Sequence, residues 1–202
     1  ACGVGFVVNI KGERSNEIVR QALTVLLNLT HRGATGAEPT TGDGAGMLLQ
    51  LSHPFFKKVC AEVDIDLPNP GEYGVGMVFL PRDENQRRAC ERRLEEIIAA
   101  EEQEHLGWRT VPTNNASLGK TALLAEPFVR QVFIKRNPNL TDAMAFERKL
   151  YVIRKLAEKA IRYSGEIEGG EAFYFTSLSY KTIVYKGMLM SEQLEAYYPE
   201  LS

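Results

Sequence analysis

The chain has 202 residues, of which 44% are hydrophobic and 25% charged, and these are the proportions of an ordinary folded domain rather than of a disordered or fibrous chain. Its 24 basic and 26 acidic residues give a net charge of −2, so no overall positive charge attracts nucleic acid or an anionic membrane. No apolar run reaches the roughly 20 residues of a membrane-spanning helix, and the first residues lack the pattern of a signal peptide. We therefore expect a soluble, cytoplasmic single domain over residues 1–202 that binds neither nucleic acid nor membranes.

The first half of the chain alternates apolar segments with glycine-rich turns. Residues 3–10 are rich in valine and predict a buried strand, and an amphipathic helix follows from Ser15. A long loop over residues 31–46 holds five of the 17 glycines. Later segments predict two more strands and a helix that Asp83 caps. These strands are expected at residues 47–51 and 73–80.

The second half of the chain continues the mixture of strands and helices. Thr141 is expected to cap a helix with an apolar stripe that runs from Phe146 to Ile161. A polar turn between two β-prone segments predicts a hairpin near the end of the chain. The strands expected here are residues 129–134, 173–178 and 182–185, with a short helix over residues 191–198. Because strands and helices do not alternate strictly, the pattern favours an α+β fold with a largely antiparallel sheet.

The three cysteines point to neither a disulfide framework nor a metal site. Cys2, Cys60 and Cys90 are odd in number and share no C-x-x-C spacing. His53 and His105 have no Asp, Glu or Cys at ligand spacing, so we expect no metal site. Cys60 and Cys90 follow apolar patterns typical of a core.

Cys2 is a candidate catalytic nucleophile. A cysteine at the amino terminus can use its own α-amine as the base, because the ordinary pKa of that amine, about 7.7–8.0, is close to neutrality. This chemistry requires the cysteine to be the first residue, whereas Ala1 precedes it here. The alternative from the residues alone is that Cys2 is a small apolar residue entering a strand.

Several sequence blocks, taken together and in order, resemble the amino-terminal glutamine amidotransferase domain of glutamate synthase. Each block alone is a weak signal, but their order and separations make the resemblance specific, and it covers nearly the whole chain. The blocks are residues 2–6 (Cys-Gly-Val-Gly-Phe), 31–37 (His-Arg-Gly-Ala-Thr-Gly-Ala), 41–46 (Thr-Gly-Asp-Gly-Ala-Gly), 107–114, 146–151, 173–178 and 182–189.

The resemblance implies a class II amidotransferase with an N-terminal-nucleophile hydrolase-like fold, a four-layer αββα sandwich with antiparallel sheets. It implies that Cys2, once it is the first residue, attacks L-glutamine and forms a thioester, with its α-amine as base. Arg32 would lie beside the cysteine and shape the site or lower the thiol pKa; otherwise it is a surface arginine in a loop. The ammonia would serve glutamate formation from 2-oxoglutarate on a synthase domain or subunit. That second site would hold flavin mononucleotide (FMN) and an iron–sulfur cluster, with no cofactor in this chain.

Two departures from the family pattern bear on activity. An acylated cysteine nitrogen has no basic lone pair, so Ala1 blocks the expected base. The motifs H-x-R-F-S-T-N and H-N-G-E-I-N, which carry the family's carboxylate-binding arginine and oxyanion donors, do not occur in the 202 residues. We therefore expect the carboxy-terminal part of the domain to be absent and this chain alone to be inactive. The alternatives are a non-catalytic fragment or docking module, or an amidotransferase domain serving another ammonia acceptor.

Overall fold

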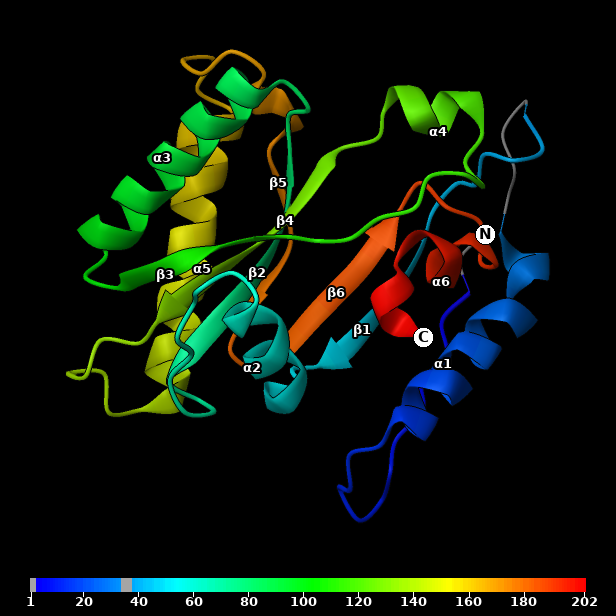
Figure 1. Ribbon diagram of the computed structural model, residues 1–202, viewed down its shortest axis with the longest axis horizontal. Coiled ribbons are helices and arrows are strands. Elements are labelled where there is room, and N and C mark those ends of the chain that lie inside the picture. The colour runs from blue at the N-terminus through cyan, green and yellow to red at the C-terminus, as the bar shows by residue number, and fades with distance from the viewer. Residues whose placement is uncertain (1–2, 34–37) are drawn as a thin grey trace. The chain divides into compact units, whose positions relative to one another are not determined.

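The structure is a computed structural model and describes residues 3–33 and 38–202, so the predicted nucleophile Cys2 lies outside the described residues. The α-helices are α1 (Asn16–Asn28), α2 (His53–Ala61), α3 (Glu84–Ala100), α4 (Lys120–Leu124), α5 (Ala143–Ala157) and α6 (Gln193–Tyr197) (Figure 1). The strands are β1 (Ala45–Gln50), β2 (Tyr73–Leu80), β3 (Glu104–Thr110), β4 (Phe128–Lys135), β5 (Tyr174–Ser179) and β6 (Thr182–Gly187). Four short turns complete the elements: η1 (Thr30–Arg32), the π-helical η2 (Glu158–Arg162), η3 (Gly170–Ala172) and η4 (Pro199–Leu201). Over this described part, no helix is both long and apolar enough to cross a membrane.

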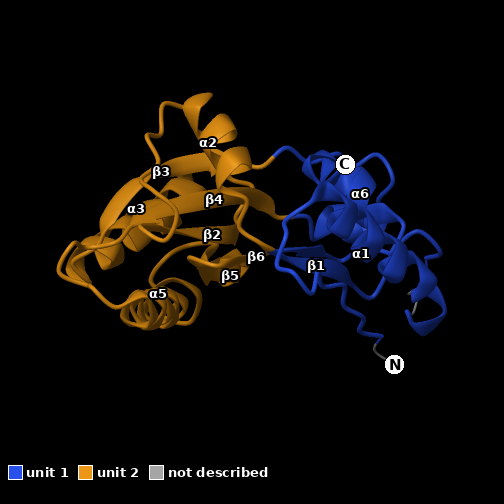
Figure 2. Ribbon diagram, turned by 90° about the horizontal axis from the view of Figure 1, so that it is seen from below, with its two compact units in different colours: residues 1–49, 112–126, 184–202 blue, residues 50–111, 127–183 orange. Residues whose placement is uncertain are grey.

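The chain divides into two compact units, each assembled from separate stretches of sequence (Figure 2). The first unit comprises Ala1–Leu49, Pro112–Glu126 and Val184–Ser202. The second unit comprises Gln50–Val111 and Pro127–Ile183. The expectation that residues 1–202 form a single domain stays a prediction.

The second unit is built on a four-stranded antiparallel sheet with the strand order β3-β4-β2-β5. Its central strand β2 is buried at seven of its eight positions, the pattern of a strand covered on both faces. A Cβ added at Gly74 would lie 2.6 Å from a methyl carbon of Leu150 on α5. The glycine therefore allows α5 to pack closely against the sheet.

Helices α3 and α5 form the main core with the sheet. Both helices are capped by an aspartate: Asp83 accepts hydrogen bonds from two N–H groups of α3, and Asp142 does the same for α5. The apolar stripe predicted for α5 is fully buried, and so is most of the stripe on α3. These side chains are Cys90, Leu94, Ile97 and Ile98 from α3, and Phe146, Leu150, Ile153, Ala157 and Ile161 from α5 and η2.

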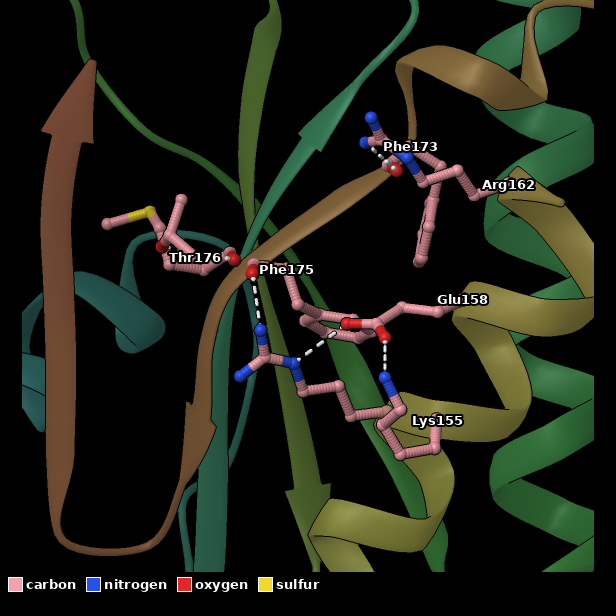
Figure 3. Close-up of polar contacts among 8 residues, drawn as sticks. Lys155, Glu158, Arg162, Phe173, Phe175 and Thr176 are labelled. Carbon is pink, nitrogen blue, oxygen red and sulfur yellow. Dashed lines mark hydrogen bonds and ion pairs between the residues drawn. The ribbon is translucent and has the colours of Figure 1, made fainter. Parts of the chain in front are cut away.

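Strand β5 lies at one edge of this sheet, and arginines from α5 and η2 cover its outer backbone (Figure 3). Arg154 donates to the carbonyl of Phe175 at 3.2 Å, and Arg162 donates to the carbonyl of Phe173 at 3.1 Å. The buried carboxylate of Glu158 accepts from Arg154 at 3.0 Å and holds it in place. The two arginines occupy the carbonyl of Phe175 within β5 and that of Phe173 just before it, which opposes pairing of another strand at these two positions.

The first unit contains helix α1, the two-stranded pairing of β1 with β6, and a small core of aromatic residues. Tyr198 is fully buried, packs edge-on against Tyr185 and Tyr197, and donates to the carbonyl of Lys186 at 2.9 Å. Tyr197 donates to Glu126 at 3.0 Å. These contacts join the last residues of the chain to β6 and to the segment after α4.

The predicted α+β class and antiparallel pairing are confirmed, but the prediction for residues 3–10 is wrong. These residues form no strand, and most of their apolar side chains are exposed, Val4 at 91% and Ile10 at 99%. A strand needs a neighbouring strand to satisfy its backbone, and β1 and β6 pair only with each other within the described part of the chain. An apolar sequence indicates a preference for burial, but it does not show whether a neighbouring strand is present to pair with.

Two further predictions need correction, and the structure also contains a strand, β3, that the sequence analysis did not predict. The strands β5 and β6 are adjacent in sequence, yet they do not form a hairpin, because β5 pairs with β2 and β6 pairs with β1. Asp142, rather than Thr141, caps α5. The segment between α3 and β4 contains β3, an edge strand whose polar residues and positive-φ Gly107 hide the alternation expected of a strand.

Candidate active site

Arg32 lies against the residue that follows Cys2. Helix α1 ends at Asn28, and the turn η1 then places Arg32, whose N–H donates to the carbonyl of Leu29 at 2.8 Å. A Cβ added at Gly3 would lie 3.0 Å from the Cβ of Arg32 and 3.2 Å from its Cγ. The glycine therefore lets the stem of Arg32 approach the backbone at the start of the chain. Of the two predicted site residues, Arg32 contacts Gly3, the residue that follows Cys2 in the sequence, and Cys2 itself lies outside the described residues.

The Arg32 side chain is exposed, and no carboxylate from the described residues is paired with it. A guanidinium of this kind remains permanently positive and offers five N–H donors in a fixed planar arrangement. Its charge is therefore available to a group that approaches the start of the chain, either an anionic oxygen or a thiolate.

The loop that begins at Arg32 ends with Asp43 near Gly33. The carboxylate oxygen Oδ1 of Asp43 lies 3.8 Å from the position of a Cβ on Gly33, the residue next to Arg32. Asp43 is exposed, like Arg32. Asp43, at the far end of the loop, therefore lies beside Gly33, the residue that follows Arg32.

Glu38 fastens the middle of this loop to the beginning of α4. Its carboxylate accepts hydrogen bonds from the N–H of Lys120 at 2.7 Å, the N–H of Thr121 at 3.1 Å and the hydroxyl of Thr41 at 2.7 Å. These bonds, led by that from Thr121, stabilise the ionised form and lower the pKa of Glu38 to about 2. Sequence reasoning missed Glu38 because its partners lie about 80 residues further along the chain, where no local pattern connects them.

Cys60 and Cys90 are buried in the second unit and are unsuited to nucleophilic chemistry. Neither thiol is exposed to solvent, and burial raises the pKa of Cys60 to about 12 and that of Cys90 to about 11. A thiol must ionise to act as a nucleophile, so these values oppose reactivity. The prediction that both are core residues is confirmed.

The histidines are not grouped with other metal-binding side chains. His53 Nδ1 lies 3.1 Å from the hydroxyl of Tyr73, and burial lowers the pKa of His105, which packs beside Trp108. Over residues 3–33 and 38–202, no three His, Cys, Asp or Glu side chains are arranged to hold a metal ion. The candidate site therefore consists of Arg32, Asp43 and the backbone at Gly3, together with Cys2 by sequence.

An α+β fold with antiparallel pairing is the architecture that the sequence resemblance implies. The chain belongs to the class II glutamine amidotransferases, whose family pattern it matches over residues 2–202. The N-terminal-nucleophile hydrolase fold that the sequence resemblance implies is confirmed by this membership.

Among characterised proteins, the chain is similar to large subunits or long chains of glutamate synthases. It is 49% identical to the glutamate synthase [NADPH] large chain of Bacillus subtilis, with all of this chain aligned to 13% of that protein. It is 41% identical to the chloroplastic ferredoxin-dependent glutamate synthase of Oryza sativa and 38% identical to the glutamate synthase [NADH] of Saccharomyces cerevisiae. The whole chain aligns to 12% of the Oryza sativa protein and to 10% of the Saccharomyces cerevisiae protein. It therefore spans about an eighth of the length of these relatives or less.

Proposed function

We propose that this domain hydrolyses L-glutamine at Cys2 and supplies the ammonia for glutamate formation from 2-oxoglutarate by the remainder of a glutamate synthase. The observation that carries the proposal is the family match over residues 2–202, which begins at the candidate nucleophile. The similarity to three glutamate synthases supports this acceptor over another one. The contact between Arg32 and Gly3 supports a site at this end of the chain.

The proposed reaction proceeds through a thioester and requires Ala1 to be removed. The freed α-amine of Cys2 accepts the thiol proton, and the sulfur attacks the side-chain amide carbon of glutamine. The carbon–nitrogen bond then breaks, and the ammonium group of Cys2 returns the proton to the leaving nitrogen, so ammonia departs. Water attacks the thioester, the carbon–sulfur bond breaks, and glutamate leaves as the thiol is restored.

Arg32 acts in this scheme through its charge. A cation near a thiol favours the thiolate, which is the reactive form of cysteine. The stem of Arg32 packs against Gly3, and this contact supports a role for the guanidinium at the start of the chain. Because its stem is already packed, the side chain loses less conformational entropy when glutamine binds.

FMN and the iron–sulfur cluster belong, in this proposal, to the remainder of the enzyme. An iron–sulfur cluster is held by about four thiolates, and this chain has three cysteines, of which Cys60 and Cys90 are buried with raised pKa values. The residues of this chain therefore do not fit the cluster, and no step of glutamine hydrolysis is assigned to either group.

The test is the Cys2→Ala variant of the full-length, processed protein. Glutamine-dependent glutamate formation should disappear because no thioester can form, whereas formation from added ammonia should continue because ammonia bypasses that step. Glutaminase turnover that persists in Cys2→Ala would refute the assignment of the nucleophile. If Cys2→Ala keeps both glutamine-dependent and ammonia-dependent glutamate formation, the domain is better described as a docking module. If the unaltered protein releases ammonia from glutamine but forms no glutamate, another ammonia acceptor is favoured.

A further inference from the structure

Three segments that are distant in sequence meet in the first unit and hold the loop that follows Arg32. They are residues 38–42, 117–121 and 189–193, which we call the loop clamp. All three belong to the same compact unit. The clamp matters because the loop carries Arg32 at one end and Asp43 at the other.

Gln193 is the central residue of the loop clamp. Only 3% of the residue is exposed, and its amide nitrogen donates to the carbonyls of Thr40 at 3.0 Å and Ser117 at 2.6 Å. Its amide oxygen accepts from the N–H of Met190 at 2.8 Å. One buried side chain thus bonds to the backbone of all three segments. Replacing it by an apolar side chain would remove the donor to the Thr40 and Ser117 carbonyls and the acceptor of the Met190 N–H.

Glu38 forms the second set of hydrogen bonds that hold the loop clamp together. Its carboxylate bonds to two backbone N–H groups at the start of α4 and to the hydroxyl of Thr41 within the loop. The N–H of Gly119 also donates to the carbonyl of Thr40 at 3.2 Å, so Thr40 receives a bond from each of the other two segments. The loop is therefore held by both its side chains and its backbone.

Two glycines allow the segments to approach this closely. A Cβ added at Gly42 would collide with the carbonyl of Leu189 and lie 2.6 Å from the nitrogen of Met190. A Cβ added at Gly119 would collide with the hydroxyl of Thr41 and lie 2.7 Å from that of Thr40. Because the obstacle at Gly42 is backbone, a side chain there would force the segments apart.

The loop clamp is connected to the candidate active site by direct contacts. Gly42 is followed by Asp43, whose carboxylate lies against Gly33, and Gly33 is bonded to Arg32 in the chain. Arg32 in turn packs against Gly3, the neighbour of Cys2. A change in the position of residues 38–42 would therefore move Asp43 away from Gly33, the residue that follows Arg32.

We infer that Gln193 and Glu38 are positioning residues for glutamine hydrolysis, which act by fixing residues 38–42 and thereby the place of Asp43 beside Gly33, the neighbour of Arg32. This inference rests on the proposed function. Neither side chain needs to touch glutamine, because a displacement of about 1 Å in a catalytic group can lower a rate by about 10²-fold.

The test compares Gln193→Met with Gln103→Met in the full-length, processed protein. Gln103 is a matched control in the second unit: only 7% of it is exposed, and it accepts from the N–H of Asn137 and donates to the carbonyl of Glu101, both at 3.0 Å. We expect Gln193→Met to lower kcat/KM for glutamine by about 10- to 100-fold. We expect Gln103→Met to leave it within about twofold of the unaltered protein, because the hydrogen bonds that Gln103 makes do not involve the loop clamp. Equal effects in the two variants would overturn the inference.

Hydrogen exchange gives a readout that does not depend on turnover. Amides of residues 38–49 should exchange faster in Gln193→Met than in the unaltered protein, while those of the second unit remain unchanged. Uniformly faster exchange would show general destabilisation and would overturn the positioning role. If Gln193→Met does not fold, Glu38→Gln replaces it under the same criteria. An unaltered protein that does not hydrolyse glutamine would instead refute the proposed function.

Discussion

The proposed nucleophile makes a sharp prediction about which of the three cysteines reacts. In the processed protein, a glutamine-like electrophile should modify Cys2 and leave Cys60 and Cys90 untouched. Burial raises the pKa of Cys60 to about 12 and that of Cys90 to about 11, and neither thiol is exposed. Both properties act in the same direction, because a buried thiol is neither ionised nor accessible.

The size of the difference follows from the fraction of each thiol that is ionised. At a pH of about 8, a thiol with a pKa of about 12 is ionised to roughly one part in 10⁴, and one with a pKa of about 11 to roughly one part in 10³. An exposed cysteine with an ordinary pKa of about 8.5 is ionised to roughly one part in four. Ionisation alone therefore favours an ordinary exposed thiol by roughly 250-fold over Cys90 and roughly 2,500-fold over Cys60.

The assay is peptide mapping by mass spectrometry after a timed reaction with the electrophile. One modified peptide, containing Cys2, is expected under native conditions, and three are expected in denaturant. The Cys2→Ala variant should remain unmodified in the native state, which controls for slow reaction elsewhere. Modification of Cys60 or Cys90 in the folded protein at the rate of Cys2 would refute the reasoning from burial and the assignment of the nucleophile together.

Three further predictions concern the site loop and the core. Arg32→Ala should lower glutaminase kcat/KM by more than its small effect on Tm explains, since the side chain is exposed; unchanged kinetics would make Arg32 a surface charge. The lowered pKa of Glu38, about 2 against an ordinary 4.5, gives stability that is present above pH 4.5 and is lost as the pH falls toward 2. The Tm of Glu38→Gln should therefore lie below that of the unaltered protein at pH 7, and the gap should shrink between about pH 5 and about pH 2; a gap independent of pH would contradict the ionised role. Leu150→Ala, at a fully buried position of α5, should lower the free energy of unfolding by about 2–5 kcal/mol in urea titration, and a loss below about 1 kcal/mol would contradict the packing described.

Local signals determined much of the second unit. The helical spacing of Phe146, Leu150 and Ile153 predicts one buried face, and all three side chains are fully buried. Asp83 caps α3 as expected, since the residues that complete the cap lie within three positions of it. Burial preference and capping depend on neighbours one or two turns away, so the sequence alone reveals them. The sequence blocks likewise identified the family, because their order is a property of the chain itself.

Tertiary structure alone decided which segments became partners. The valine-rich residues 3–10 were expected to form a strand, but in the described part of the chain no strand lies beside them. β5 and β6 have the spacing of a hairpin, yet each gains its hydrogen bonds from a different and more distant strand. The bond from Gln193 to Thr40 joins residues 153 positions apart, and no local periodicity can report such a contact. Short-range patterns determine the secondary structure that a segment prefers, whereas the free energy of long-range pairing decides which other segments it packs against.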